Sequence, residues 1–480
     1  MREVQGRRTV CAIGLAALLS ASLFYLALVF TAVPSCGTVL GPATVSQFKL
    51  PSLHFDGVTK FRLPGDEFPN GITVASDGSV WFGEQNLPGV AHLFENGTMV
   101  QYAWPINYSP STTAIWGVAQ WNGRIWASDA LGAQIISLDP TTANVYAVKL
   151  SNPSSFPYTI TVGMDDALWF TELYGSNLGR IDAKCTLKEY PTPTNLGGTP
   201  TQIEFENSTF GYYLDVGNAT SGLGQVLSFS TTHFAPQPFG GSFRPIAPTS
   251  LTLVPDGLWV AQHASSNLAY YDFHSHTWIQ YPTTPVSYIE TTLPYFVAAN
   301  GSLVWFNEHY ANRMAVIDTT HGLLTEYSLS NPPANKTTEI DNALTFALGK
   351  DKVWFTELTA NYVGYINASY RPNFSIIGSM ANQPLELRPG DNVTLNFTAT
   401  GFSSRPLSFK FADNENFTSQ PNKIMMSANA AEIRLLNNQT TIIITVRTRS
   451  TLSPGSYILL VSVTDGSIDR GIYVRLQINE

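Results

Sequence analysis

The sequence predicts an all-β protein: a seven-bladed β-propeller over residues 57–369, followed by an immunoglobulin-like β-sandwich over 376–480, with an amino-terminal transmembrane helix. Three observations lead to this prediction. A strand motif centred on tryptophan recurs at intervals of 43 to 49 residues, the repeat stops near residue 375, and residues 11–33 carry no charge. Strand-rich repeats of this length are typical of propeller blades, and about 20 apolar residues suffice to cross a membrane.

The amino-terminal segment is expected to be an uncleaved membrane anchor. Arg2, Arg7 and Arg8 precede the apolar run of residues 11–33, so residues 1–10 should stay in the cytoplasm. The run is longer than the apolar core of a secretory signal, and no A-x-A cleavage site follows it closely. We therefore predict a single-pass protein of the cell membrane, with most of the chain outside the cytoplasm.

Residues 34–56 are expected to be a linker between the anchor and the propeller. The three cysteines of the chain, Cys11, Cys36 and Cys185, cannot form a disulfide framework. A Cys36–Cys185 bridge is conceivable. The sequence VPSC loosely resembles a lipobox, which leaves lipid attachment at Cys36 as an alternative.

Potential glycosylation sites agree with an extracytoplasmic chain, because N-x-S/T sequons mark surface acceptors in secreted proteins. Twelve asparagines lie in such sequons: Asn96, Asn107, Asn207, Asn218, Asn300, Asn335, Asn367, Asn373, Asn392, Asn396, Asn416 and Asn438. The formal net charge is -9, and we find no basic run after the first eight residues. A nucleic-acid partner is therefore not expected, since it would need a basic face.

The repeat itself is carried by an aromatic residue in a short strand, as in SVWFGE (79–84) and KVWFTE (352–357). The seven aromatic positions are Trp81, Trp126, Trp169, Tyr212, Trp259, Trp305 and Trp354. Each repeat resolves into four alternating strands, and the first of these usually starts at a proline. The last repeat lacks a fourth strand, so we expect residues 58–65 to supply it and close the ring.

Residues 376–480 contain about seven short strand candidates separated by turns. That number of strands in some 100 residues is typical of an immunoglobulin-like sandwich. Appended sandwiches usually act as spacers or adhesion modules, and no chemistry is assigned to this one.

The repeat resembles the virginiamycin B lyase family of seven-bladed propellers over residues 57–369. The matching pieces are FPNGITVASDGSVWFGE (68–84), DDALWFTELYGSNLGRID (165–182) and KVWFTELTANYVGYI (352–366). The resemblance implies a C–O lyase that opens a cyclic depsipeptide at its ester by elimination, with help from Mg²⁺. It also implies a histidine base directly after the strand-one proline. A glutamate two residues before a histidine, in an E-P-H-G-I motif, is implied as a metal ligand.

None of the positions in this chain that correspond to that base is a histidine: Asn70, Trp116, Tyr158, Thr201, Thr249, Tyr295 and Asn342. We therefore assign no catalytic residue. By the resemblance these residues rim the central pocket, and aromatic faces with amides and hydroxyls suit an uncharged polar ligand such as a glycan or peptide. The alternative is that they only plug the mouth of the channel.

The third residue after the aromatic is usually acidic: Glu84, Asp129, Glu172, Asp215, Gln262, Glu308 and Glu357. These carboxylates either accept hydrogen bonds from the next turn, helped by Asn177, Asn267, Asn312 and Asn361, or form a ring that holds a cation. His263 and His309 follow two of these positions, so His263, Glu308 and His309 are candidate metal ligands.

The expected function is non-catalytic binding or scaffolding at the cell surface, with no cofactor. One alternative is a divalent-cation-dependent lyase that opens cyclic esters with Glu339, Asp341 or Glu308 and requires Mg²⁺. Another is a structural subunit of a surface layer or membrane complex.

Overall fold

The computed structural model describes residues 36–106, 113–217, 222–286, 291–330, 343–378, 384–414 and 423–480. These residues form forty strands and one short 3-10 helix, η1 (Thr194–Leu196). The predicted transmembrane helix at 11–33 lies outside the described residues. Within them, no helix is long and apolar enough to span a bilayer.

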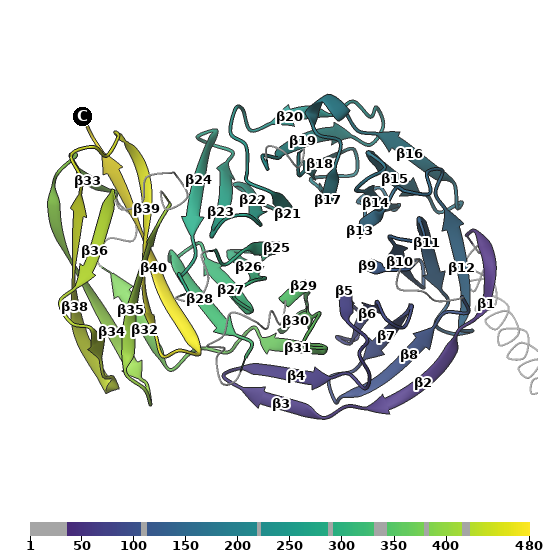
Figure 1. Ribbon diagram of the computed structural model, residues 1–480, viewed down its shortest axis with the longest axis horizontal. Coiled ribbons are helices and arrows are strands. Elements are labelled where there is room, and N and C mark those ends of the chain that lie inside the picture. The colour runs from purple at the N-terminus through teal and green to yellow at the C-terminus, as the bar shows by residue number, and fades with distance from the viewer. Residues whose placement is uncertain are drawn as a thin grey trace, which may run out of the picture.

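Seven antiparallel sheets are arranged as blades around a central axis, as predicted (Figure 1). Strand one of each blade lies nearest the axis. Blades one to three contain β5 (Pro69–Val74), β6 (Val80–Glu84), β7 (Gly89–Leu93), β8 (Thr98–Ala103); β9 (Ile115–Trp121), β10 (Arg124–Asp129), β11 (Gln134–Leu138), β12 (Asn144–Lys149); and β13 (Pro157–Val162), β14 (Leu168–Glu172), β15 (Asn177–Ile181), β16 (Leu187–Pro191).

The remaining blades follow the same order. Blades four to six contain β17 (Pro200–Phe205), β18 (Phe210–Asp215), β19 (Gln225–Ser230), β20 (Gln237–Phe239); β21 (Pro248–Val254), β22 (Gly257–Gln262), β23 (Asn267–Asp272), β24 (Thr277–Pro282); and β25 (Pro294–Asn300), β26 (Leu303–Glu308), β27 (Arg313–Asp318), β28 (Leu323–Ser328). Blade seven contains β29 (Ala343–Leu348), β30 (Lys352–Glu357) and β31 (Tyr362–Asn367), and its fourth strand is β4 (Val58–Arg62).

The pairing of β4 with β31 confirms that the amino-terminal segment closes the ring. The expectation of a plain linker over residues 34–56 is wrong. β1 (Thr38–Pro42), β2 (Thr44–Lys49) and β3 (Ser52–Phe55) add fifth strands to blades two, one and seven. This segment, residues 36–62, runs along the outer rim of the ring (Figure 1), and we call it the strap.

A disulfide joins Cys36 at the start of the strap to Cys185, in the turn between β15 and β16 of blade three. The two Cα atoms are 5.0 Å apart. The bridge that the sequence left open is therefore present, and it uses the sulfur that the lipid alternative would have needed. The disulfide attaches the strap to blade three, although the strap adds no strand to that blade.

The repeated aromatic residues hold the blades together. Trp126, Trp169 and Trp354 are each at most 1% exposed, and their rings lie between adjacent sheets. Trp354 of blade seven, for example, packs in one core with Phe82 of blade one. A buried tryptophan removes roughly 200 Å² from water, which stabilises the fold by about 4–5 kcal/mol.

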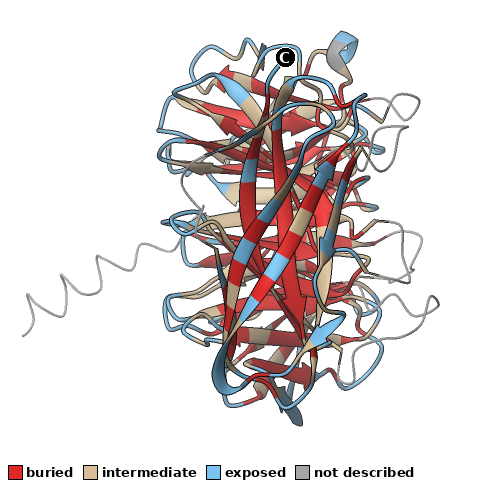
Figure 2. Ribbon diagram, turned by 90° about the vertical axis from the view of Figure 1, so that its left-hand side faces the viewer, coloured by how far each residue is buried: buried red, intermediate tan, exposed pale blue. Residues whose placement is uncertain are grey.

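The carboxy-terminal strands form two facing sheets, as predicted, whereas their immunoglobulin-like type stays a prediction. One sheet contains β32 (Phe374–Gly378), β34 (Asn392–Phe402), β38 (Leu436–Thr448) and β36 (Ile424–Ala428). The other contains β40 (Ile468–Ile478), β39 (Gly455–Thr464), β35 (Leu407–Asp413) and β37 (Glu432–Ile433), with β33 (Leu385–Leu387) parallel to the end of β40. Figure 2 views the molecule from the side on which these sheets lie.

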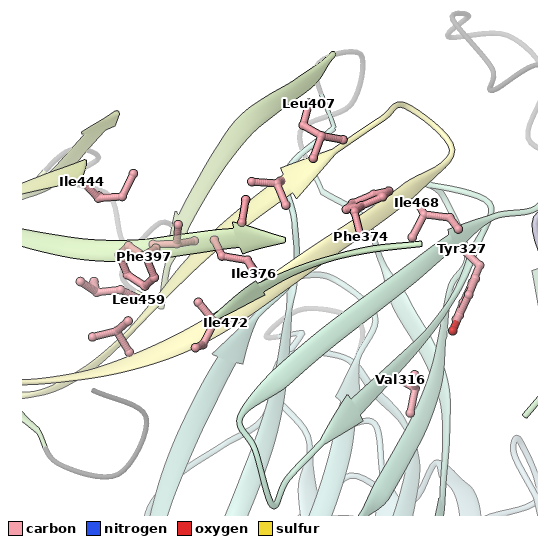
Figure 3. Close-up of a cluster of buried hydrophobic side chains, with 14 of the residues drawn as sticks. Val316, Tyr327, Phe374, Ile376, Phe397, Leu407, Ile444, Leu459, Ile468 and Ile472 are labelled. Carbon is pink, nitrogen blue, oxygen red and sulfur yellow. The ribbon is translucent and has the colours of Figure 1, made fainter. Parts of the chain in front are cut away.

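The sandwich is joined to blade six through its backbone. β40 pairs antiparallel with β28, from Leu323 opposite Ile472 to Tyr327 opposite Ile468. The cores of the two parts are also continuous, because Tyr327 of blade six lies in the same apolar cluster as Phe374 and Ile468 of the sandwich (Figure 3). The sandwich therefore continues the outer edge of blade six and is not a separately tethered module.

Candidate functional site

The predicted ligand-binding residues lie where strand one of each blade departs from regular pairing. In blades one, three and six the ladder shifts register between Asn70 and Ile72, Pro157 and Ile160, and Pro294 and Val297. Bulges of this kind re-aim side chains and are frequent next to functional sites. The residues before the strand-one prolines turn sharply, with positive φ at Phe68, Phe156, Ala247 and Leu293.

Aromatic rings form a continuous series on this face of the propeller. Tyr174, which is 65% exposed, lies 5.0 Å from Phe156 between ring centroids. Phe156 lies 6.1 Å from Trp116, and Trp116 lies 5.0 Å from Tyr158. The series therefore begins at an exposed loop of blade three and leads through blade two to the channel.

The series continues across the channel. The Tyr158 hydroxyl is hydrogen-bonded to the hydroxyl of Tyr295, although β13 and β25 stand on opposite sides of the ring (Figure 1). Tyr295 lies 5.4 Å from His309, which lies 5.2 Å from His263. We call these seven residues the aromatic track: Tyr174, Phe156, Trp116, Tyr158, Tyr295, His309 and His263.

The two histidines reach this face because the loop after strand two bonds to the residue before strand one. The His309 amide donates to the Leu293 carbonyl at 2.9 Å, and the His263 amide donates to the Ala247 carbonyl at 3.1 Å. Burial lowers the pKa of His309 to about 4, with a smaller contribution from the His263 charge. Burial also lowers the pKa of His263, so both imidazoles are neutral at pH 7.

Burial has the opposite effect on the pKa values of the tyrosines, because it disfavours their anions. It raises the pKa of Tyr295 to about 12 and that of Tyr158 well above its usual value. The hydroxyls of Tyr158 and Tyr295 are therefore protonated near neutral pH, beside two neutral imidazoles.

The other predicted rim residues are engaged in the scaffold. Asn70 is fully buried, accepts from the Gly71 amide at 2.8 Å and donates to the Ile115 carbonyl at 3.4 Å. Thr249 donates to the Tyr295 carbonyl at 2.5 Å. Thr201 is buried and its hydroxyl has no hydrogen-bond partner. Asn342 lies outside the described residues.

Sequence reasoning missed a set of side chains that fix the track from behind. The residue before the repeated acid is often small and polar, and it bonds to strand one of the next blade. Ser128 donates to the Tyr158 carbonyl at 2.7 Å, Thr171 donates to the Thr201 carbonyl at 3.3 Å, and Asn307 donates to the Leu344 carbonyl at 3.1 Å. The threonine of the repeated WFTE sequence was the signal from which these contacts between blades could have been predicted.

The two repeated aspartates accept hydrogen bonds from turn amides, in the manner of the first alternative. Asp215 accepts from the amides of Gly198 at 2.7 Å and Gly217 at 2.8 Å, and Asp129 accepts from Ala114 and Gly132, both at 3.1 Å. The expected asparagine helpers act in part.

Asn177 donates to Glu172 at 3.2 Å, Asn312 donates to Glu357 at 3.0 Å, and Asn361 instead accepts from the Glu67 amide. The side-chain oxygen of Asn267 has no hydrogen-bond partner. Glu84 is fully buried, and burial raises its pKa to about 8.

The metal site proposed from His263, Glu308 and His309 is not formed. Glu308 is buried against Arg313 at 3.4 Å, and Arg313 also contacts Glu326 at 3.3 Å and Asp469 at 2.6 Å. Among the residues that the structure describes, no three histidine, cysteine or acidic side chains are grouped to hold a metal ion. Glu308 is therefore paired with the guanidinium of Arg313.

The eight sequon asparagines in the described part of the chain are all exposed: Asn96, Asn207, Asn300, Asn367, Asn373, Asn392, Asn396 and Asn438. The other four, Asn107, Asn218, Asn335 and Asn416, lie outside it. Accessibility is necessary for glycosylation but does not show that a sugar is attached, so these sites stay predictions.

Comparison with known proteins finds similarity to one family over part of the chain. Residues 47–228 match the virginiamycin B lyase family. A virginiamycin B lyase from Nocardia farcinica (strain IFM 10152) is 28% identical over 127 residues, which cover 26% of this chain and 43% of that protein. The match thus spans less than half of the relative's length.

Solved structures agree in fold. A streptogramin B lyase superposes with a TM-score of 0.53 at 23% identity, covering 65% of this chain and 97% of the other. A catalytically inactive virginiamycin B lyase from Staphylococcus aureus with quinupristin gives 0.54 at 18% identity, covering 68% and 99%. By its sequence over residues 47–228 and by its fold, this protein contains a virginiamycin B lyase-like propeller.

Proposed function

We propose that this protein binds a ligand at the outer surface of a cell membrane, anchored by residues 11–33, and that the aromatic track is its recognition site. The observation that carries the proposal is the continuity of the track from exposed Tyr174 to the channel. Aromatic faces that are partly exposed and fixed from behind bind flat apolar surfaces with little loss of side-chain entropy.

The ligand is an uncharged polar molecule such as a glycan or a peptide. The track supplies stacking surfaces in Trp116 and Phe156 and protonated hydroxyls in the tyrosines. Its histidines are neutral at pH 7, so neither contributes a formal charge that would select an ionic ligand. Stacking with a few hydrogen bonds is the combination by which neutral polar ligands are bound.

Two features support the extracytoplasmic location. The Cys36–Cys185 disulfide is stable in oxidising compartments and rare in the cytosol. The described sequon asparagines are exposed, as acceptors in a secreted chain must be.

Screening of glycan and peptide panels against the full chain in detergent tests the proposal. Trp116→Ala and Tyr174→Ala each remove one ring and should weaken binding by about three- to tenfold, the effect of an aromatic pair worth about 0.5–1.5 kcal/mol. Phe402→Ala removes an aromatic side chain of the sandwich that is 40% exposed and should leave affinity unchanged. Equal losses in all three variants would place the binding elsewhere.

A lyase is the second candidate function, and one observation favours it. His309 and His263 come from different elements than the expected base, yet they lie beside Tyr295 at the strand-one start. A neutral imidazole there can accept a proton from a substrate carbon. Glu308 is held by Arg313, and Glu339 and Asp341 lie outside the described residues, so these acids supply no support.

Incubation with a cyclic depsipeptide of the streptogramin B class and Mg²⁺ separates the two functions. A linear product of unchanged mass that disappears in His309→Gln means elimination and contradicts the binding proposal. An intact ring at high protein concentration supports binding. A product heavier by one water means hydrolysis and contradicts both.

A further inference from the structure

The seam between the propeller and the sandwich contains two cavities. The larger, of about 680 Å³, is bounded by the turns of blades five and six and by Ile458 and Arg475 of the sandwich. The second, of about 590 Å³, lies along β24 and shares Ile458 and Arg475 with the first. Both are in the size range of ligand-binding cavities, about 300–1,000 Å³.

Aromatic rings line the larger cavity. Trp259 lies 4.8 Å from Tyr270 and 4.9 Å from Tyr281, and Tyr281 meets Tyr473 edge-on at 5.1 Å. Trp259 is buried beneath Tyr270 and Tyr281, which are partly exposed. The Tyr270 hydroxyl is fixed by a 3.0 Å bond to the Asp256 carbonyl, so its ring is a preformed surface.

The polar rim of this cavity favours an uncharged ligand that offers hydroxyls. Asp256 and Arg475 contribute one charge of each sign, and Ser302, Thr319 and Thr320 contribute hydroxyls. Apolar ring faces beside hydroxyl and planar charged groups match a saccharide, which has apolar C–H faces and many hydroxyls.

A saccharide acceptor stands at the rim of the cavity. Asn300, the last residue of β25, forms a sequon with Gly301 and Ser302 of the turn that leads to β26. Asn300 is exposed, and the other two residues of the sequon line the cavity. A sugar attached to Asn300 therefore starts next to the rings that suit it.

We propose that Asn300 carries an N-linked glycan whose first sugars pack into this cavity against Tyr270 and Tyr281. The Asn300 Nδ2 forms a bond to the anomeric carbon of a lipid-phosphate-linked oligosaccharide, the phosphate oxygen leaves with the bonding electrons, and Nδ2 releases one proton. The docked glycan then covers the seam between blades five and six and the sandwich. This inference rests on the proposed extracytoplasmic location.

The test uses the full chain, expressed in a host whose secretory pathway transfers N-glycans. Peptide mass mapping gives the occupancy of each site, and a peptide N-glycosidase is applied to the native and the denatured protein. The glycan on Asn300 should be released at least tenfold more slowly from the native chain than the glycans on exposed Asn96 and Asn438. All three should be released at similar rates after denaturation.

Variants separate docking from simple steric hindrance at the turn. Asn300→Gln and Ser302→Ala both remove the sequon, whereas Ser302→Thr keeps it and is the matched control. The two sequon-removing variants should lower the midpoint of thermal unfolding by the same amount relative to Ser302→Thr. Arg475→Ala, which opens the rim, should speed native release of the Asn300 glycan but not of the Asn438 glycan.

Each other outcome overturns the inference. If the remaining sequons are occupied and Asn300 is not, the proposed glycan at the seam is contradicted, whereas the extracytoplasmic location is supported. If no sequon is occupied, both the glycan at the seam and the extracytoplasmic location are contradicted. Equal native release at Asn300 and Asn438 means that the glycan is attached but lies in solvent.

Discussion

Blades six and seven each contain a strand from a distant part of the chain, but the two strands have different roles. In blade seven, β4 pairs with β31 and takes the place of the missing fourth strand. In blade six, four strands are already present, and β40 pairs outside them with β28. The first strand completes the ring, whereas the second attaches another structure to it.

The charges at the two junctions reflect this difference. Lys60 of β4 is buried, lies 2.5 Å from Glu357 and donates to the Leu329 carbonyl at 2.8 Å. Asp469 of β40 contacts Arg313, which also contacts Glu308 and Glu326. At the blade-seven junction the strap lysine contacts one acid, Glu357, whereas the cation of blade six has three acidic partners.

Deletion of the strap should have the largest effect. Without residues 36–62 blade seven loses β4. Val58 leaves the core that it shares with blades six and seven, and Phe61 leaves the core that it shares with blades one and seven. We expect insoluble protein or loss of a cooperative unfolding transition by circular dichroism. Deletion of residues 371–480 should leave a closed ring that still unfolds cooperatively. The reverse result would mean that the sandwich, and not the strap, completes the propeller.

Single substitutions should also lower the free energy of unfolding more at the blade-seven junction than at the blade-six junction. Lys60→Met leaves Glu357 buried without that cation and should lower the free energy of unfolding by about 3–5 kcal/mol. Asp469→Asn leaves Arg313 with two acidic partners and should cost about 1–2 kcal/mol, close to one charged hydrogen bond. Urea denaturation measures both. Equal losses would show that the additional acids contribute nothing at blade six.

Loss of the disulfide should weaken blade seven but not the β28–β40 junction. The bond spans a sequence separation of 149 residues, and its removal by Cys36→Ser should cost about 2–5 kcal/mol. Hydrogen exchange at the β4 amides should speed up while exchange at the first half of β40 stays unchanged. Cys185→Ser should reproduce the effect, and the double variant should add nothing further.

An effect confined to low pH is expected where blade six carries His309 and blade seven carries Leu358. The folded-state pKa of His309, about 4, lies below its unfolded value near 6.5. The folded state therefore binds fewer protons, and the stability present at pH 7 is lost as pH falls from about 6.5 to 4. His309→Leu should recover about 1–3 kcal/mol at pH 4 relative to pH 7. An unchanged pH profile would mean that His309 is protonated in the fold.

The repeat could be predicted from sequence because each blade encodes its own strands. The seven blades were predicted from the Trp-centred strands and the turn signals between them. The ring closure was predicted from the strand-like residues 58–65. The strap strands β1–β3 were not predicted, because fifth strands have no repeat signal and pair only where a blade edge is exposed. The β28–β40 pairing was missed for the same physical reason.

The candidate site shows the same limit. The period placed Trp116, Tyr158 and Tyr295 at equivalent positions, but only the closed ring brings Tyr158 and Tyr295 together across the channel. The role of Glu308 could not be inferred because its partner network includes Asp469, more than 150 residues later in the chain. Contacts between blades are set by tertiary geometry that no local pattern contains.

The strap has a consequence for biosynthesis. β4 is made near the beginning of translation, yet its partner β31 emerges about 300 residues later, so closure has to wait for almost the whole propeller. At about 5–20 residues per second, this leaves an unpaired apolar strand for tens of seconds. Cys185 emerges long before β31, so the disulfide can hold the waiting segment against blade three. Formation of this disulfide during synthesis would then protect the nascent chain from aggregation until the ring is complete.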